Sequence, residues 1–451
     1  MKHLSLKRAP RHSILAVLIL GLVFSIATKG RSHSLSPKDH EQVFEKVWKD
    51  IDDHYYDPEF GGVNWQEIHR RYQPLVSAAK DDKDFYSVLD RMTAELHDAH
   101  TRFSSPEQWR NHEKHQVVSL GFRPGYVEGK VVVLDVIPES NAARAGIEPG
   151  MIVTALDGQP ITERLAESAK HVLPSSSERV TELRVLGNAF AGSLETPFAV
   201  SLQRADGTQF EAKFTRQVLS NAPHVTFAKL ASGFGYLRFD EFQPALVKDF
   251  KAALEDLRDR PGLILDLRWN RGGVGATLEA MAGFFFESKT LFERRMTRKQ
   301  VAVSERDGHH SAEMEYFVGK KRGQIYSGSV VILVSEYSAS ATEVFAAGMQ
   351  DSGRATLVGS QSCGCVLGIT HDRVMRGGGV LEISEVLWFS PKARKLEGEG
   401  VIPDRVAVPT IASLQEKRDP VLDEGIRVLK ELSGARRSEA PLERQRDAAL
   451  N

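Results

Sequence analysis

The spacing of apolar residues changes along the chain and separates several segments. Between about residues 36 and 106, apolar side chains recur every three or four positions, which places them on one face of a helix. Examples are Val43, Val47 and Ile51, followed by Phe85, Val88, Leu89, Met92 and Leu96. Breaks are expected at the Tyr55-Tyr56-Asp-Pro turn and at Gly61-Gly62. We therefore predict a helical N-terminal domain over residues 36–110.

The next segment, residues 116–219, has a different pattern. The run Val131–Val136 is a strand candidate, and Pro149-Gly150 and Asp157-Gly158 are turn signals. From residue 222 to 432, short apolar strands alternate with helical patterns. The expected strands are Phe234–Phe239, Leu263–Leu267 and Val330–Val334, and the expected helices run from Ala245 to Leu257 and from Thr342 to Gln350. This alternation predicts an α/β core with helices packed on a sheet.

The two ends of the chain carry charge. Basic residues from Lys2 to Arg11 precede an apolar run from Ile14 to Thr28, which is short for a membrane span. We predict a signal peptide over residues 1–30, with an uncleaved membrane anchor as the alternative, and hence a periplasmic or secreted protein. Residues 434–451, rich in Arg and Glu, are expected to be a solvated tail.

Composition excludes several functions. Lys and Arg number 59 against 60 Asp and Glu, a net charge of −1, so no basic footprint for nucleic acid is present. Two cysteines, Cys363 and Cys365, are too few for a disulfide framework or a four-cysteine zinc site. His112/His115 and His309/His310 lack further ligands at metal-binding spacing, and no phosphate-binding glycine loop is found. We expect neither a metal nor a cofactor.

One serine lies at a chemically useful position. Ser340 follows the predicted strand Val330–Val334 and opens the predicted helix, where free N–H groups can stabilise an oxyanion. Ser340-Ala-Thr-Glu343 is also a capping box, which many helices carry without any catalytic role. Two further elements favour chemistry. The strand Gly262–Leu267 runs into a turn at Gly272-Gly273, and Gln350–Gly359 closes the helix after the serine.

These elements resemble the carboxy-terminal processing (tail-specific) peptidases, serine endopeptidases related to the tricorn core and to the interphotoreceptor retinoid-binding modules. The resemblance covers roughly residues 44–429 and includes the ending Glu397–Asp404. Within residues 116–219, Leu120-Gly121-Phe122 and Asn141–Gly150 resemble a PDZ domain. In PDZ domains such a loop holds a peptide's terminal carboxylate while the peptide adds to a sheet edge. The alternative is a small β-domain without peptide binding.

The resemblance implies roles for individual residues. Ser340 matches the nucleophile, and the N–H groups of Ala341 and of Gly273 or Gly272 match the oxyanion hole. Asp351 matches an acidic residue of the processing peptidases. At about 1.5 Å rise per residue it lies too far along the helix to be the base, so we expect a supporting role.

The expected base departs from the family. Processing peptidases carry a catalytic lysine 25 residues after the nucleophile, where this chain has Cys365, and Lys320, Lys321 and Lys392 do not match that element. His97-Asp98-Ala99-His100-Thr101 resembles the element that supplies a histidine base in tricorn-like relatives, which implies His100 as base and Glu397 as its support. A packing histidine is the alternative. Cys363 and Cys365 could be free thiols, a disulfide or, less simply, chemically active.

The sequence is compatible with three alternative functions. The first is an exported serine endopeptidase that takes polypeptide substrates by C-terminal or unfolded segments. The second is a catalytically inactive PDZ scaffold of the same fold. The third is a binding module for small apolar ligands, because fold alone does not fix function.

Overall fold

The structure is a computed structural model that describes residues 7–8, 34–194, 196–307, 313–319 and 325–433. The predicted signal peptide and charged tail lie outside this range, except for Lys7–Arg8, which form the short strand β1. Lys320, Lys321, His309 and His310 also lie outside it. Among the described residues, no helix combines the length and apolarity needed to cross a bilayer.

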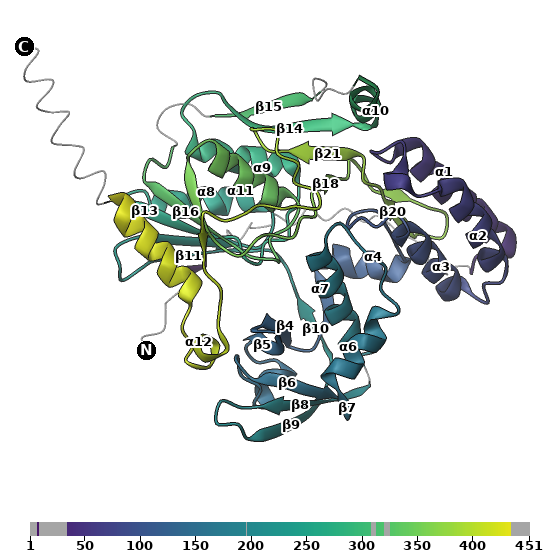
Figure 1. Cartoon of the computed structure of the whole chain (residues 1–451), viewed down its shortest axis with the longest axis horizontal. Coiled ribbons are helices and arrows are strands. Elements are labelled where there is room, and N and C mark those ends of the chain that lie inside the picture. Colours follow the sequence, from purple (N-terminus) through teal and green to yellow (C-terminus); the bar gives the residue numbers. More distant parts are fainter. Residues whose placement is uncertain (1–6, 9–33, 195, 308–312, 320–324, 434–451) are drawn as a thin grey trace, which may run out of the picture.

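The N-terminal helices form a bundle with its own core (Figure 1). Ser36 caps the first helix, and Phe44, Ile51, Phe85 and Leu89 are buried between the helices. The elements are α1 (Pro37–His54), η1 (Phe60–Gly62), α2 (Trp65–Ser77) and α3 (Asp82–Ala94).

The periodicity of residues 36–110 predicted helices alone, but the segment also contains a strand. The strand β2 (Arg102–Ser104) precedes α4 (Pro106–Glu113) and pairs with the distant β20 (Val380–Glu382), which also pairs with β19 (Arg373–Val374). Leu381 and Ile383 thereby enter the helical core. A three-residue strand carries too little periodicity to be recognised before its partner is known.

Residues 116–220 form a separate β-rich layer below the rest of the molecule (Figure 1). The strand order is β4-β5-β6-β8-β9, with β7 paired to β6. The antiparallel pair β3/β10 connects this sheet to the preceding and following parts of the chain. Helices α5, α6 and α7 accompany the sheet. The bounds are β3 (Gln116–Ser119), β4 (Phe122–Val127), β5 (Lys130–Val136), α5 (Asn141–Arg144), β6 (Ile152–Leu156), β7 (Gln159–Pro160), α6 (Ile161–Ala169), α7 (Glu178–Ala189), β8 (Pro197–Gln203), β9 (Gln209–Thr215) and β10 (Gln217–Ser220).

The C-terminal half is an α/β layer around the sheet β1-β11-β12-β13-β16-β17-β22, parallel from β12 onwards. Alternate residues of β16 face opposite sides. Val330 and Ile332 pack with α8, α9 and α11, whereas Val331 and Leu333 pack with the helical residues 420–433. Burial on both faces explains the continuous apolar run that predicted this strand.

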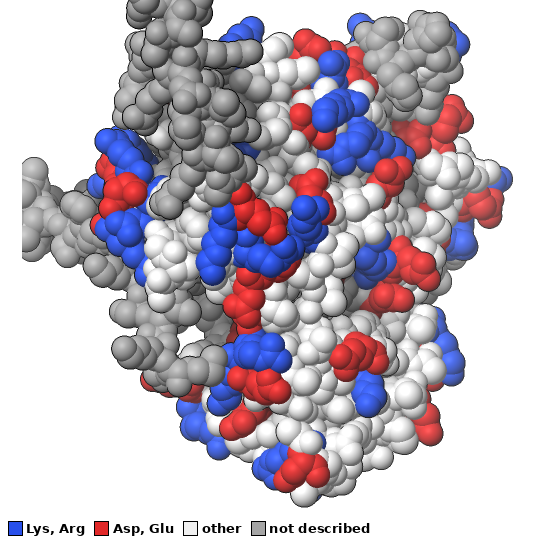
Figure 2. All heavy atoms as spheres, turned by 60° about the vertical axis from the view of Figure 1, so that its left-hand side comes forward, with Lys and Arg blue, Asp and Glu red and all other residues white. Residues whose placement is uncertain are grey.

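The elements of this layer include the three predicted strands and the two predicted helices, whose ends agree with the prediction to within a few residues. They are β11 (Val225–Lys229), β12 (Gly235–Phe239), η2 (Pro244–Leu246), α8 (Val247–Asp256), β13 (Gly262–Asp266), α9 (Gly275–Ala282), η3 (Gly283–Phe285), β16 (Ser329–Val334), α11 (Ala341–Asp351), β17 (Ala355–Gly359), β22 (Arg405–Val406) and α12 (Ile411–Gln415). A second sheet, β15-β14-β21-β18, covers one side and was not predicted. Its elements, with the adjoining α10, are β14 (Thr290–Thr297), α10 (Arg298–Asp307), β15 (Met314–Val318), β18 (Leu367–Gly368) and β21 (Val386–Phe389). Charges of both signs are mixed over the face shown in Figure 2, in keeping with the near-zero net charge.

Candidate active site

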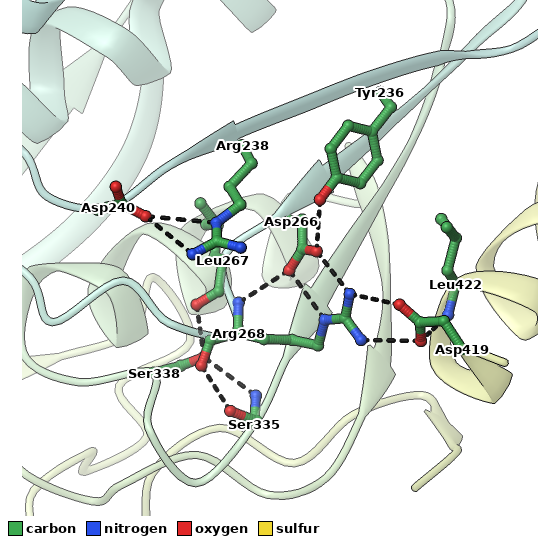
Figure 3. Close-up of polar contacts among 10 residues, drawn as sticks. All are labelled: Tyr236, Arg238, Asp240, Asp266, Leu267, Arg268, Ser335, Ser338, Asp419 and Leu422. Carbon is green, nitrogen blue, oxygen red and sulfur yellow. Dashed lines mark hydrogen bonds and ion pairs between the residues drawn. The ribbon is translucent and has the colours of Figure 1, made fainter. Parts of the chain in front are cut away.

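The chain turns sharply between β16 and α11, and two serines fix this corner (Figure 3). Ser338 Oγ donates to the carbonyl of Leu267 at 2.8 Å and accepts from the backbone N–H of Ser335 at 3.0 Å. Ser335 Oγ donates to the carbonyl of Arg268 at 2.6 Å. The corner is therefore tied to the end of the neighbouring parallel strand β13.

Ser340 occupies the strained position of the corner. Its backbone lies at φ 58°, ψ −126°, and a non-glycine residue with positive φ costs of order 1–3 kcal/mol and persists only where its surroundings hold it. They do so here, because its N–H donates to the Cys365 carbonyl at 2.9 Å and to Glu343 Oε2 at 3.0 Å. A serine on a strained strand-to-helix turn is the arrangement of a nucleophile elbow.

Glu343 is the hub beneath this corner. Its carboxylate also accepts from Ser362 Oγ at 2.6 Å, from Gly364 N at 2.7 Å and from Cys365 N at 3.1 Å. Complete burial raises the pKa of Glu343 to about 7, although the four donors oppose that shift. From the sequence Glu343 could be assigned only a local cap, since the capping-box pattern does not reveal the distant loop that it binds.

Cys363 and Cys365 form a disulfide with a Cα–Cα distance of 5.3 Å. Both are buried, and Ala99 and Ala339 pack against them, so the segments that carry His100 and Ser340 meet at this loop. Among the described residues, Glu343 and these two cysteines are a group with metal-ligating atoms within 4.8 Å of one another. The disulfide and the hydrogen bonds of Glu343 already engage those atoms.

The di-glycine turn lies against Ser340. A Cβ on Gly272, whose φ is +102°, would come within 2.6 Å of the Ser340 Cβ and 3.0 Å of the Ala341 nitrogen. The N–H of Gly272 donates to Asn270 Oδ1 at 2.9 Å, so of the two glycines only Gly273 remains a candidate donor. Within the described residues, the N–H groups of Gly273 and Ala341 have no backbone partner.

His100 follows a loop that Asp98 organises. Asp98 Oδ1 accepts from the backbone N–H groups of His100 and Thr101, both at 2.6 Å, and from Ser384 Oγ at 3.1 Å. Burial lowers the pKa of His100 to about 4, against the opposing charge of Asp98. The imidazole is therefore neutral at neutral pH, and its buried Nδ1 has no hydrogen-bond partner among the described residues.

A single cavity of about 460 Å³ brings the central residues together. Ser340, Ala341, Gly273 and His100 all line it. The lining includes the apolar residues Val274, Val344, Leu367 and Trp388. It also includes charged or titratable residues, namely Arg102, His112, Glu241, Arg271, His371, Asp372 and Glu382. The arrangement can place a carbonyl between a hydroxyl, an imidazole and two N–H donors.

The other predicted residues lie outside this cavity. Glu397 accepts from Val366 N at 2.6 Å and from the Ser176 hydroxyl, and burial raises its pKa to about 8. The same Ser176 hydroxyl accepts from Ala99 N at 3.0 Å, so Glu397 reaches the His100 loop through Ser176. Asp351, at the far end of α11, pairs with Arg394 at 2.6 Å and accepts from the backbone N–H of Lys392.

The predicted peptide-binding loop lies in the β-rich layer. Leu120 and Phe122 are buried in its core, and Gly121 has φ +84°. The N–H of Gly121 donates to Ser119 Oγ at 3.0 Å. Phe122 opens β4, which pairs with β5 on one side and, among the described strands, has no partner on the other.

Comparisons with known proteins agree with this architecture. Residues 233–407 match the sequence model of Peptidase family S41, and residues 36–94 match that of the Tricorn protease C1 domain. Residues 233–407 thus match an S41 peptidase domain, and the predicted resemblance of the chain to the carboxyl-terminal-processing proteases is confirmed.

Particular relatives extend over most of the chain. Carboxyl-terminal-processing peptidase 1, chloroplastic, of Arabidopsis thaliana is 24% identical over 393 residues, covering 84% of this chain and 74% of the relative. The solved structure of a photosystem II D1 C-terminal processing protease aligns with a TM-score of 0.55 and 21% identity, over 86% of this chain and 97% of that one. The structure titled mature CPAF complexed with lactacystin aligns with a TM-score of 0.65 and 13% identity, over 88% and 98%. These structural likenesses show the fold.

Proposed function

We propose that this chain is a serine endopeptidase in which Ser340 is the nucleophile and His100 the general base. The observation that carries the proposal is the single cavity lined by Ser340, His100, Gly273 and Ala341. The S41 domain and the processing-protease relatives support a polypeptide substrate.

In the proposed mechanism Ser340 Oγ attacks the scissile carbonyl carbon while the neutral imidazole of His100 takes the hydroxyl proton. The N–H groups of Gly273 and Ala341 stabilise the oxyanion. His100 then gives its proton to the departing amine, and the C–N bond breaks to leave an acyl-Ser340. Water, deprotonated by His100, hydrolyses this ester and regenerates the hydroxyl.

We assign residues 116–219 to a PDZ domain that captures the substrate. The free edge of β4 supports this assignment, since an extended peptide can add there as a further strand. The loop Leu120-Gly121-Phe122 would hold the terminal carboxylate, with the Ser119 hydroxyl displaced from Gly121 N. Export through residues 1–30 completes the proposal and places the enzyme in the periplasm or outside the cell.

One observation favours a second candidate, an inactive PDZ scaffold. The position at which the processing peptidases carry their lysine is Cys365, and that residue is bound in a disulfide. The two candidates differ in whether His100 can replace the lysine.

Cleavage of an unfolded polypeptide tests the choice. The purified chain, its Ser340→Ala and His100→Ala variants and the control His171→Ala, which changes an exposed histidine on the β-rich layer, would be compared after circular dichroism confirms folding. We expect a loss of at least about 10³-fold for Ser340→Ala and about 10²–10³-fold for His100→Ala, with the control unchanged. Cleavage that persists in Ser340→Ala would refute the serine mechanism, and an inactive wild type that binds peptides would favour the scaffold.

A further inference from the structure

A second hollow, distinct from the Ser340 cavity, lies between the β-rich layer and the α/β layer. It consists of a cavity of about 490 Å³ and an adjoining one of about 270 Å³, which share Tyr126, Glu336 and Ser360. Neither shares a lining residue with the Ser340 cavity. Tyr126 lies on β4, and Tyr337, which lines the larger cavity, lies in the corner before Ser340.

The hollow lies at the C-terminal end of β4. Tyr126 and Val127, near the end of this strand, line the larger cavity, and Leu183 of α7 lines the smaller one. A chain added along β4 from the loop at Leu120–Phe122 would therefore run into the junction of the two cavities. At about 3.3 Å per residue, the four positions from Phe122 to Tyr126 correspond to about four residues of the added chain.

Carboxylates outnumber cations among the side chains that line the smaller cavity, with Glu182 and Glu336 against Arg179. Arg268 is paired with Asp266 and Asp419, and Arg238 with Asp240 (Figure 3). Arg179 keeps its positive charge, but its guanidinium N–H groups are engaged by the backbone carbonyls of Ser362 and Glu399. Glu336 accepts only from Ser360 Oγ, and neither Glu336 nor Glu182 has an ion-pair partner among the described residues.

Aromatic groups complete the site. Tyr126 is 37% exposed, and the Tyr337 ring is stacked on Trp269 at 4.6 Å. The Tyr337 hydroxyl is buried and has no hydrogen-bond partner within the described structure. Two carboxylates beside tyrosine rings favour a cation, because the ring face attracts positive charge and the carboxylates accept its N–H groups.

We propose that this junction is a subsite for a lysine or arginine side chain of the substrate, about four residues before the end held at Leu120–Phe122. The inference rests on the proposed function, since it needs a polypeptide bound along β4. It adds a preference that the apolar loop alone does not give: an apolar C-terminus preceded at a fixed distance by a basic residue.

Peptide binding to the full chain carrying Ser340→Ala tests this without cleavage. Three labelled ten-residue peptides with the same apolar C-terminus would carry lysine, norleucine or glutamate at the fourth residue before the end, and fluorescence anisotropy would give each Kd. We expect the lysine peptide to bind about five- to tenfold more tightly than the norleucine peptide and to lose this advantage at high salt.

The same measurement on Glu336→Gln and Glu182→Gln assigns the effect. Each variant should remove most of the lysine preference while leaving the norleucine peptide within twofold. Glu163→Gln, an exposed glutamate on α6 of the same layer, is the matched control and should change neither Kd.

The outcomes separate the two proposals. Equal binding of the lysine and norleucine peptides, or a lysine preference that survives both variants, overturns the subsite and leaves the proposed function intact. Failure of every peptide to bind removes peptide capture along β4 and the subsite with it, and cleavage by the wild type then decides the catalytic proposal separately.

Discussion

The two sides of the candidate active site are held in different ways. On the nucleophile side, the backbone N–H of Ser340 donates to Glu343 and to the Cys365 carbonyl, all within the α/β layer. On the base side, the His100 loop is held from other segments: Ser176 and Arg184 of the β-rich layer contact Ala99 and Asp98 at 3.0 and 3.2 Å. The hydrogen bonds of Ser340 itself thus stay within the α/β layer, whereas the loop that carries His100 is bonded directly to the β-rich layer.

The largest effect is expected from the hub of the nucleophile side. Glu343→Ala leaves three buried donors, Ser362 Oγ, Gly364 N and Cys365 N, without their acceptor, which should cost about 3–5 kcal/mol, lower Tm by about 10 °C and reduce kcat at least 100-fold. Thermal melts and peptide hydrolysis measure both quantities. Glu163→Ala, at an exposed site, should change neither, and wild-type kcat in Glu343→Ala would show that the hub does not position Ser340.

The base side is probed by pH. The depressed pKa of His100, about 4, keeps the imidazole neutral at pH 5, where a histidine of pKa about 6.5 would be mostly charged and activity would fall about 30-fold. We therefore expect the acid limb of kcat/KM near pH 4. Folding stability depends on pH in the same direction. Because the pKa of His100 is lower in the folded chain than in the unfolded one, the contribution of His100 to the free energy of unfolding is complete above pH 6.5 and is lost as the pH falls towards 4. An acid limb near 6.5 would contradict the buried base.

The next largest effect on kcat is expected from the contact between the di-glycine turn Gly272-Gly273 and Ser340. In Gly272→Ala the new methyl group meets the Ser340 Cβ at 2.6 Å, and the φ of +102° disfavours any side chain. A loss of about tenfold or more in kcat is expected. Gly233→Ala shares a positive φ of +88° but has open space around it, so it should cost about 1 kcal/mol of stability and no activity. Equal activities of the two variants would refute the predicted close fit.

The smallest effect should come from Asp351. Its pairing with Arg394 is partly exposed, so Asp351→Asn should cost about 1 kcal/mol in denaturant unfolding and change kcat less than twofold. A tenfold lower kcat in a folded Asp351→Asn would instead indicate a role in the reaction.

The sequence predicted the elements that have a long or continuous apolar pattern. Helices α1 and α3 and the buried strands β13 and β16 are such cases. It did not predict the pairing of β2 with β20 or the sheet β15-β14-β21-β18, because these short strands are specified by partners distant in the chain.

For the candidate site, the family resemblance pointed to Ser340, His100, Gly273 and Ala341, which the structure places around one cavity. It did not reveal that Asn270 takes the N–H of Gly272 or that Glu343 binds the Cys363–Cys365 loop. Both are contacts between side chains and backbone groups that local sequence patterns do not encode.

Covalent labelling tests the central claim most directly. A fluorophosphonate reacts with an activated serine hydroxyl, and mass spectrometry of the digested protein locates the adduct. We predict a single adduct on the peptide that contains Ser340, absent in Ser340→Ala and formed at least about 100-fold more slowly in His100→Ala. An adduct on another residue, or equal labelling rates in the wild type and in His100→Ala, would contradict the assignment of Ser340 and His100 as nucleophile and base.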